Sequence, residues 1–274
     1  MVFIFSNPKS HFSNLIFMNN RLTELFKHKK NNLLSIYFTA GYPDLTDTLR
    51  IAKALEDAGA DFLEIGFPYS DPVADGPTIQ QSSEVALKNG MSLKVLFEQL
   101  KDLRKEIKVP IILMGYVNPV LQYGVEKFCN DAATAGIDGV IVPDLPMYEY
   151  EEMYQDFFIR NNLSNIFLIT PQSADERIRK IDELSKGFIY ALSSSATTGT
   201  NLAVSSDQTN IYFNRLKNLH LNNPLMIGFG ISDRESFNKA CSTANGAIIG
   251  SAFVKVLDNG FDETRVHSFV KAIL

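Results

Sequence analysis

The chain has 274 residues with a formal net charge of −5, and 45% of its residues are hydrophobic and 21% charged. These values are typical of a soluble globular protein whose length suits one large barrel or two small domains. No basic cluster stands out, which excludes nucleic acid as an expected partner, and the two isolated cysteines provide neither a disulfide framework nor metal-ligand spacing, which indicates a cytoplasmic location.

Residues 1–17 form an N-terminal segment of their own. Its apolar runs, Val2–Phe5 and Leu15–Phe17, are separated by the polar segment Asn7–His11, and no charged region precedes the first run. This pattern is poor for a signal peptide and too short for a membrane span. Because helical sequence starts directly after Met18, we expect residues 1–17 to be a disordered or mis-annotated extension and residues 18–274 to form the folded catalytic domain. No membrane is expected to be involved.

From Asn32 onward, short apolar runs alternate with amphipathic stretches of helical period. The apolar runs predict strands at 33–39, 61–65, 110–114, 139–142, 166–169, 188–192, 225–227 and 247–249. The amphipathic stretches predict helices at 47–58, 92–106, 125–135, 150–161, 174–184, 208–218, 233–240 and 263–274. Hydroxyl side chains just before four of these stretches are predicted to cap the helices: Thr46, Ser92, Ser173 and Ser232.

Eight strands alternating with eight helices predict a single (β/α)8 TIM barrel, an α/β fold. A doubly wound open sheet is the alternative. Its dinucleotide fingerprint, G-x-G-x-x-G, is missing after the first predicted strand, where Thr39-Ala40-Gly41-Tyr42-Pro43 stands instead. In a barrel the functional site lies at the C-terminal ends of the strands, so the segments that follow each strand are the candidates.

The second predicted strand carries an acid, Glu64, among apolar residues, and Asp75 follows on a loop rich in proline and glycine. A lone Glu would more often be a surface charge or an ion-pair partner, but two acids joined by a rigid loop favour a site. Burial would raise the pKa of Glu64 and let it donate a proton near neutral pH. Asp75, on a more polar loop, is expected to stay ionised and to accept a hydrogen bond.

Three other groups of residues follow strands. The glycine turns at 228–232 and 250–252 suit a phosphate, although simple turns are the alternative. The small polar segment 193–201 suits a mobile lid. Tyr37, Tyr116 and Tyr190 lie at or near strand ends, where aromatic rings suit a flat apolar substrate or simply pack in the core. No histidine falls at a strand end, and no metal site is expected.

The run from Leu63 to Gln80, which reads Leu-Glu-Ile-Gly-Phe-Pro-Tyr-Ser-Asp-Pro-Val-Ala-Asp-Gly-Pro-Thr-Ile-Gln, closely resembles the signature of the tryptophan synthase alpha subunit. Segments 113–119, 142–146, 228–231 and 250–252 are similar to other motifs of that family, in the same order. The resemblance extends from about Asn19 to the C-terminus.

This resemblance implies a barrel enzyme of L-tryptophan biosynthesis that cleaves indole-3-glycerol phosphate to indole and D-glyceraldehyde 3-phosphate in a retro-aldol reaction. Glu64 matches the family's acid–base catalyst, which protonates the indole ring at the carbon bearing the side chain. Asp75 matches the acid that holds the indole N–H. The indole is passed to a beta subunit in an alpha-beta-beta-alpha heterotetramer. The resemblance implies no cofactor in this chain and pyridoxal phosphate only in the beta subunit.

The resemblance also implies roles for further residues. Gly199, Gly228, Gly230, Gly250 and Ser251 match the phosphate site. Tyr37, Leu113, Tyr190 and the lid residue Thr198 match the substrate pocket. Asp71, Pro72 and Asn118 match positions that face the beta subunit. The lid departs from the pattern, because Ser194 and Ala196-Thr197 stand where many members have Arg and Gly-Val.

Several alternatives stay open at this point. The chain could be a free-standing indole-3-glycerol phosphate lyase that releases indole, or a catalytically silent subunit that only activates a beta subunit. A phosphate-binding barrel isomerase is a third possibility. The segment from Glu64 to Asp75 argues against the isomerase, and the presence of both acids together with the glycine turns argues against the silent subunit.

Overall fold

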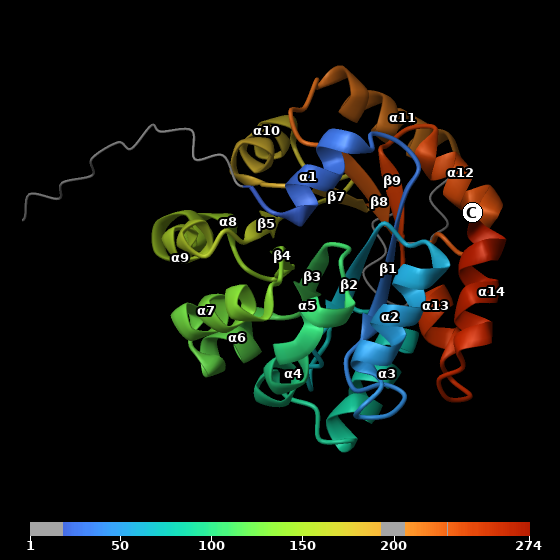
Figure 1. Ribbon diagram of the computed structural model, residues 1–274. Coiled ribbons are helices and arrows are strands. Elements are labelled where there is room, and N and C mark those ends of the chain that lie inside the picture. Colours follow the sequence, from blue (N-terminus) through green and yellow to red (C-terminus); the bar gives the residue numbers. More distant parts are fainter. Residues whose placement is uncertain (1–18, 193–205, 229) are drawn as a thin grey trace, which may run out of the picture.

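The computed structural model describes residues 19–192, 206–228 and 230–274 (Figure 1). The expected N-terminal extension lies outside the described residues, as do Phe229 and the whole polar segment 193–201, which includes Thr198 and Gly199.

One parallel sheet forms the centre of the fold, with strand order β5-β4-β3-β2-β1-β9-β8-β7-β6. The two ends of this order, β5 and β6, are consecutive in the chain and separated only by Phe167. This stretch is joined to β7 and to the residues just before it by backbone hydrogen bonds from Lys186 N to Asn165 O (3.1 Å) and from Tyr190 N to Phe167 O (3.0 Å). The sheet is therefore a closed barrel with one interrupted strand, which confirms the predicted (β/α)8 fold.

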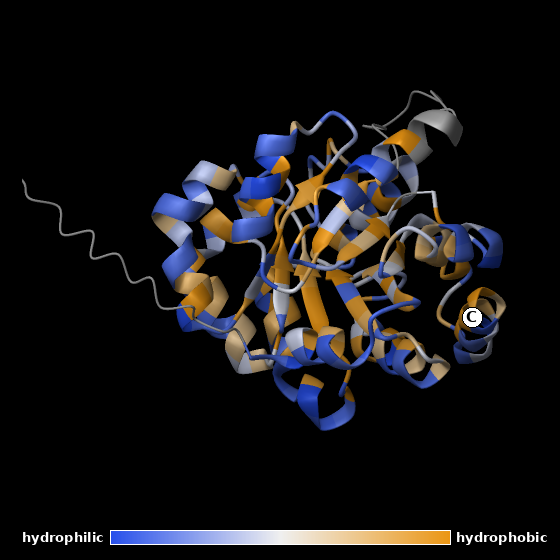
Figure 2. Ribbon diagram, turned by 90° about the horizontal axis from the view of Figure 1, so that it is seen from above, coloured by the Kyte–Doolittle hydropathy of each residue, from blue (hydrophilic) through white to orange (hydrophobic). Residues whose placement is uncertain are grey.

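Each predicted strand is present, within two residues at either end. The strands are β1 (Leu33–Thr39), β2 (Phe62–Gly66), β3 (Ile111–Met114), β4 (Gly139–Ile141), β5 (Ser164–Ile166), β6 (Leu168–Ile169), β7 (Ile189–Leu192), β8 (Leu225–Gly228) and β9 (Gly246–Ile249). In Figure 2 they form an apolar centre, with hydrophilic residues concentrated on the surrounding helices. Apolar runs bounded by turn residues thus identified buried strands correctly.

The helices surround the sheet (Figure 1). They are α1 (Arg21–His28), α2 (Thr48–Ala58), α3 (Pro77–Lys88), α4 (Leu93–Gln99), η1 (Leu100–Asp102), α5 (Leu103–Glu106), α6 (Val117–Tyr123), α7 (Val125–Ala135), α8 (Met147–Glu149), the π-helical η2 (Tyr150–Tyr154), α9 (Gln155–Arg160), α10 (Asp175–Leu184), α11 (Ser206–Asn218), α12 (Arg234–Cys241), α13 (Ser251–Val256) and α14 (Glu263–Ile273). No helix within the described ranges is long and apolar enough to cross a membrane.

Helix starts were predicted less well than strands. Ser92 caps α4 as expected, accepting from Val95 N at 3.3 Å. The other three predicted caps are wrong. The residue before α2 is Asp47 rather than Thr46, and the one before α10 is Ala174, because Ser173 instead accepts from Thr170 N. The cap of α12 is Asp233 rather than Ser232, since Asp233 forms a reciprocal capping box with Ser236.

Helices α3, α6, α8 and α13 were not predicted. In α3 the buried face consists of Ile79, Ser82, Ser83 and Ala86, so two of its four buried positions are serines. A hydroxyl face of this kind hides the apolar period that identifies an amphipathic helix. The other three are short, with seven residues or fewer.

The barrel has two hydrophobic cores. The larger one lies between the strands and the helices, and the smaller one fills the barrel interior. Helix α1 contributes the buried Leu22 and Phe26 to the inner core. The Phe26 ring lies 6.2 Å from Phe62 and 5.8 Å from Phe188, between ring centroids. Because Phe62 and Phe188 lie at the N-terminal ends of β2 and β7, α1 closes the base of the barrel and leaves the opposite end for a site.

Candidate active site

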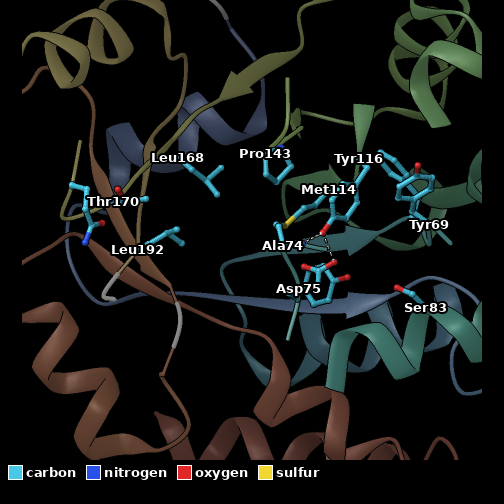
Figure 3. Close-up of a pocket in the computed structure, with 14 residues that line it drawn as sticks. Tyr69, Ala74, Asp75, Ser83, Met114, Tyr116, Pro143, Leu168, Thr170 and Leu192 are labelled. Carbon is cyan, nitrogen blue, oxygen red and sulfur yellow. Dashed lines mark hydrogen bonds between the residues drawn. The ribbon is translucent and has the colours of Figure 1, made fainter. Parts of the chain in front are cut away.

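A cavity of about 350 Å³ opens at the C-terminal end of the barrel (Figure 3). In Figure 3, Leu168, Thr170 and Leu192 lie on one side of it, and Met114, Tyr116 and Asp75 on the other. The full lining consists of Tyr37, Phe67, Tyr69, Ala74, Asp75, Ser83, Met114, Gly115, Tyr116, Pro143, Leu168, Thr170, Gln172 and Leu192. The cavity is thus largely apolar with a few polar groups, as small-molecule sites usually are.

Glu64 lies in the middle of β2, opposite Tyr37 of β1 and Ile112 of β3. Its side chain is 0% exposed, and burial raises its pKa to about 8. Ser35 Oγ donates a hydrogen bond to Glu64 Oε1 at 3.2 Å, which opposes the rise. Glu64 does not line the cavity itself; Met114, one inward-facing position nearer the mouth on β3, does. A carboxyl group with this pKa is protonated at neutral pH and can act as an acid.

Asp75 lies on the loop between β2 and α3, at the cavity wall. Burial raises its pKa to about 6, and a hydrogen bond from Tyr116 opposes the rise. Tyr116 Oη donates to Asp75 Oδ2 at 3.2 Å and accepts from Ala74 N at 2.9 Å, the two bonds drawn dashed in Figure 3. Gln80 Nε2 donates to the Asp75 carbonyl at 2.8 Å. These contacts fix the loop. With a pKa of about 6, Asp75 is largely ionised at neutral pH, whereas Glu64, with a pKa of about 8, is protonated.

Two tyrosine side chains occupy the interior near both acids. The pKa values of Tyr37 and Tyr190 are raised, by burial first and then by charges that include Glu64 and Asp75. Two glycines make room for them: a Cβ on Gly66 would lie 2.1 Å from the Tyr37 hydroxyl, and one on Gly228 would lie 2.0 Å from the Tyr190 hydroxyl. The structure therefore places Tyr37 and Tyr190 with the two acids, and Gly228 has a packing reason to be glycine.

The expected phosphate residues other than Gly199, which lies outside the described residues, are at the ends of neighbouring strands β8 and β9. Gly228 ends β8, and Gly230 follows in the left-handed region with φ of 75°. Gly250 follows β9 and directly precedes α13, which begins at Ser251. Gly230 and Ser251 are exposed. This arrangement puts two turns at one end of the sheet, as a phosphate site in a barrel requires.

The expectation for Leu113 is wrong by one residue. Leu113 is fully buried in the outer core, between the sheet and the helices. Its neighbour Met114 points inward and lines the cavity. Side chains along a strand alternate between faces, so a shift of one position exchanges the cavity for the outer core.

The residues expected to face a partner lie beside the cavity on the surface. Asp71 and Asn118 are exposed, and Pro72 is half-buried. Asn118 Nδ2 donates to Tyr69 Oη at 3.2 Å, which links the start of α6 to the loop after β2. The Tyr69 and Tyr116 rings lie 5.3 Å apart, so this surface is continuous with the cavity wall.

Sequence patterns alone do not single out several residues around the site: Ser35, Phe67, Tyr69, Ser83, Met114, Pro143, Leu168, Thr170, Gln172 and Leu192. For the residues on strands, one signal could have found them. Side chains along a strand alternate between its two faces, so an inward-facing residue such as Glu64 identifies the other inward-facing positions once the register between strands is known. Among the described residues, no group of three or more His, Cys, Asp or Glu side chains could hold a metal ion.

Comparison with known proteins decides the family. The family profile described as "Tryptophan synthase alpha chain" matches residues 23–272. The chain belongs to the tryptophan synthase alpha chain family. It is 54% identical over 255 residues to the tryptophan synthase alpha chain of Christiangramia forsetii, covering 93% of this chain and 98% of the relative. It is 52% identical to that of Flavobacterium psychrophilum, with 93% and 99% covered.

The fold agrees with solved structures of the tryptophan synthase alpha family. Tryptophan synthase subunit alpha from Legionella pneumophila superposes with a TM-score of 0.83 at 30% identity, covering 93% of this chain and 97% of that structure. The chain is a lyase of the tryptophan synthase alpha type, which cleaves indole-3-glycerol phosphate in tryptophan biosynthesis. The isomerase alternative is therefore not supported.

Proposed function

We propose that Glu64 and Asp75 divide the acid–base work of this cleavage. The observation that carries the proposal is the difference in their surroundings: Glu64 is fully buried with one hydrogen bond from Ser35, whereas Asp75 lines the cavity and accepts a hydrogen bond from Tyr116. Burial raises the pKa of Glu64 to about 8 and that of Asp75 to about 6. Between these values Glu64 is an acid and Asp75 a carboxylate. Two carboxyl groups in different environments can take opposite roles in one reaction.

The reaction begins when Glu64 gives its proton to the ring carbon of indole that carries the glycerol chain. The ring nitrogen then gains positive charge, and Asp75 stabilises it by accepting its N–H hydrogen bond. The bond between the ring and the side chain breaks, and its electron pair restores the aromatic indole. The side-chain hydroxyl loses its proton as the aldehyde forms, and the Glu64 carboxylate left by the first step is the base for this proton.

The rest of the site holds the substrate. Gly228, Gly230, Gly250 and Ser251 bind the phosphate through backbone N–H groups at the ends of β8 and β9, together with Gly199. Tyr37 and Tyr190 surround the indole ring, and Thr198 belongs to the lid that closes over it. Met114, Leu168 and Leu192 form apolar walls of the cavity, which supports binding of a flat aromatic ring there.

The family implies a beta subunit as partner. We propose an alpha-beta-beta-alpha heterotetramer in which Asp71, Pro72 and Asn118 face the beta subunit, which receives the indole. Their position beside the cavity supports this arrangement. Pyridoxal phosphate belongs to the beta subunit in this scheme, and the chain itself needs no cofactor. The cytoplasmic location indicated by the two cysteines stays a prediction.

The proposal predicts a bell-shaped pH profile. Activity requires protonated Glu64 and ionised Asp75, so kcat/KM should rise with a pKa near 6 and fall with a pKa near 8. Tyr37 and Tyr190 have pKa values raised above 10 and do not titrate in this range. Initial rates from pH 5 to pH 9.5 check this. A profile that still rises above pH 8 would mean that Glu64 must be ionised from the start.

The decisive experiment is indole release from indole-3-glycerol phosphate by the purified full chain, with and without a beta subunit. Cleavage that accelerates when the beta subunit is added supports the proposal. Strong cleavage that the beta subunit does not change favours a free-standing lyase. If no indole forms in either case while the beta subunit is still activated, the chain is a silent subunit and the proposed chemistry is wrong.

A further inference from the structure

Ser35 is a buried hydroxyl inside the barrel, next to the proposed acid. It lies on β1 between the inward-facing Leu33 and Tyr37, and its exposed fraction is 0%. Its hydroxyl donates to Glu64 Oε1 at 3.2 Å. A buried serine usually satisfies its hydroxyl with a nearby backbone carbonyl, so a serine bonded to an inward-facing acid calls for a chemical reason.

The two oxygens of Glu64 have different surroundings. Oε1 accepts the bond from Ser35, whereas Oε2 is buried and has no hydrogen-bond partner among the residues that the structure describes. A carboxylic acid places its proton on one oxygen and keeps the other as an acceptor. Because Ser35 donates to Oε1, the proton of the neutral acid belongs on Oε2.

We propose that Ser35 is a positioning residue for Glu64: it holds Oε1 as the acceptor oxygen and leaves Oε2 as the oxygen from which the proton is transferred. This inference rests on the proposed acid role of Glu64. Ser35 itself does not line the cavity.

The proton transfer shows why this bond matters. The O–H bond at Oε2 breaks, its electron pair stays on the carboxyl group, and the proton forms a C–H bond with the indole ring carbon. Glu64 thereby changes from a neutral acid to a buried anion. A hydrogen bond to an ionised group is stronger than one to a neutral group, so the bond from Ser35 strengthens as the charge develops. Ser35 therefore stabilises the state that follows proton transfer more than the state before it.

The other groups around Glu64 do not supply this stabilisation. The charge of Glu64 raises the pKa values of Tyr37 on β1 and Tyr190 on β7, but neither phenol donates a hydrogen bond to Glu64 in the part of the chain that the structure describes. From β3, Ile112 and Met114 are apolar. The charge of Asp75 raises the pKa values of the same two phenols, and this negative charge would oppose ionisation of Glu64. Among the influences on the pKa of Glu64, burial raises it and the bond from Ser35 lowers it.

The test uses the full chain with its beta subunit and compares the wild type with Ser35→Ala and Ser35→Thr. Loss of the hydroxyl in Ser35→Ala should move the alkaline limb of kcat/KM upward by about one pH unit, a tenfold change in the ionisation constant. The plateau should fall several-fold because Glu64 becomes a weaker acid, while KM for indole-3-glycerol phosphate stays unchanged. Ser35→Thr keeps the hydroxyl and should restore the limb.

A matched control is Ser164→Ala, which removes another fully buried serine, at the base of the barrel and bonded to Asn20. Its alkaline limb should stay at the wild-type position. If Ser35→Ala fails to fold, Ser35→Cys keeps the shape with only a weak S–H donor and should shift the limb in the same direction by less. A foldable Ser35 variant without a hydroxyl whose limb does not move overturns the proposal.

A carbon-13 NMR titration of the Glu64 carboxyl carbon separates this inference from the proposed function. It reports the pKa of Glu64 without any turnover. If the wild type releases no indole but Ser35→Ala still raises this pKa, the proposed function fails while the coupling of Ser35 to Glu64 stands. If indole is released normally and the Glu64 pKa is the same in both proteins, the role of Ser35 is wrong and the proposed function stands.

Discussion

Two carboxylates in this barrel are equally inaccessible to solvent, but one has several polar partners and the other has one. Asp138, at the base just before β4, pairs with Arg104 at 2.5 Å and Arg21 at 3.1 Å, and it accepts from Ile111 N at 3.0 Å. Glu64, toward the mouth, accepts one bond from Ser35 and leaves Oε2 without a partner in the described structure. Both are 0% exposed. A paired acid holds the scaffold together, whereas an underpaired one with a raised pKa is suited to proton transfer.

The largest expected effect is on catalysis at the mouth. Glu64→Gln removes the transferable proton and should lower kcat by about 10²–10⁴-fold, the usual contribution of a positioned acid or base. Indole release at saturating substrate measures this, with circular dichroism to establish that the barrel is folded. Asp75→Asn is the companion variant and should lose activity of similar order. Near-normal rates in both variants would mean that the acids at the mouth are not catalytic and do not differ in this respect from Asp138 at the base.

The pH dependence of stability should separate Glu64→Gln from the wild type as well. The pKa of Glu64 is about 8 in the folded chain against 4.5 ordinarily, so the folded state binds the extra proton between these values. Wild-type stability should therefore fall, relative to the variant, as pH rises from about 4.5 to about 8, by up to about 1.4 kcal/mol per pH unit.

Urea unfolding of both proteins from pH 5 to pH 9 measures this difference. The raised pKa of Asp75 affects the stability of both proteins equally, so it cancels in the difference between them. The difference should be constant above the folded pKa, where both the folded and unfolded wild type have lost the proton. Two stability curves that stay parallel from pH 5 to pH 8 would show that burial does not raise the pKa of Glu64.

At the base, loss of charge should affect stability and spare the chemistry. Asp138→Asn leaves Arg104 partly buried beside a neutral group and should lower the free energy of unfolding by about 3 kcal/mol. The activity of the folded fraction should stay within a few-fold of the wild type. Asp102→Asn is the control, because Asp102 pairs with Lys105 on the surface and should change stability by less than about 0.5 kcal/mol. Equal losses for both variants would contradict the structural role of Asp138.

The comparison also explains what the sequence could and could not predict. Glu64 stood out because an acid is unusual among apolar strand residues, and the apolar runs located each strand within two residues. Asp138 gave no such signal, since its partners Arg21 and Arg104 lie 117 and 34 residues away along the chain. Such pairing depends on tertiary contacts that no local pattern contains.

Errors around the site have a similar origin. The resemblance implies Leu113 for the pocket, but Met114 lines it. Composition does not reveal this difference of one residue, because a buried strand is apolar on both faces. Ser35 carries no chemical signal as a serine within a strand, because only the folded structure brings its hydroxyl to Glu64, two residues beyond its register partner Phe62 on β2. Helix α3 was missed because serines form half of its buried positions. Thr198 and Gly199 lie outside the described residues and stay predictions.

The smallest expected effect concerns the second acid at the mouth. Tyr116 Oη donates to Asp75 Oδ2 and lowers its pKa, so Tyr116→Phe should raise that pKa above about 6. The acidic limb of kcat/KM should then move to higher pH, so that activity is reduced a few-fold at pH 6.5 and close to normal at pH 7.5. Tyr69→Phe is the matched control, because its hydroxyl accepts from Asn118 rather than bonding to Asp75. An acidic limb that shifts in neither variant would mean that burial alone sets the pKa of Asp75, and an equal shift in both would contradict a specific effect of the Tyr116 hydroxyl. Pairing with Tyr116 would then play no part in setting the charge of the second acid at the mouth.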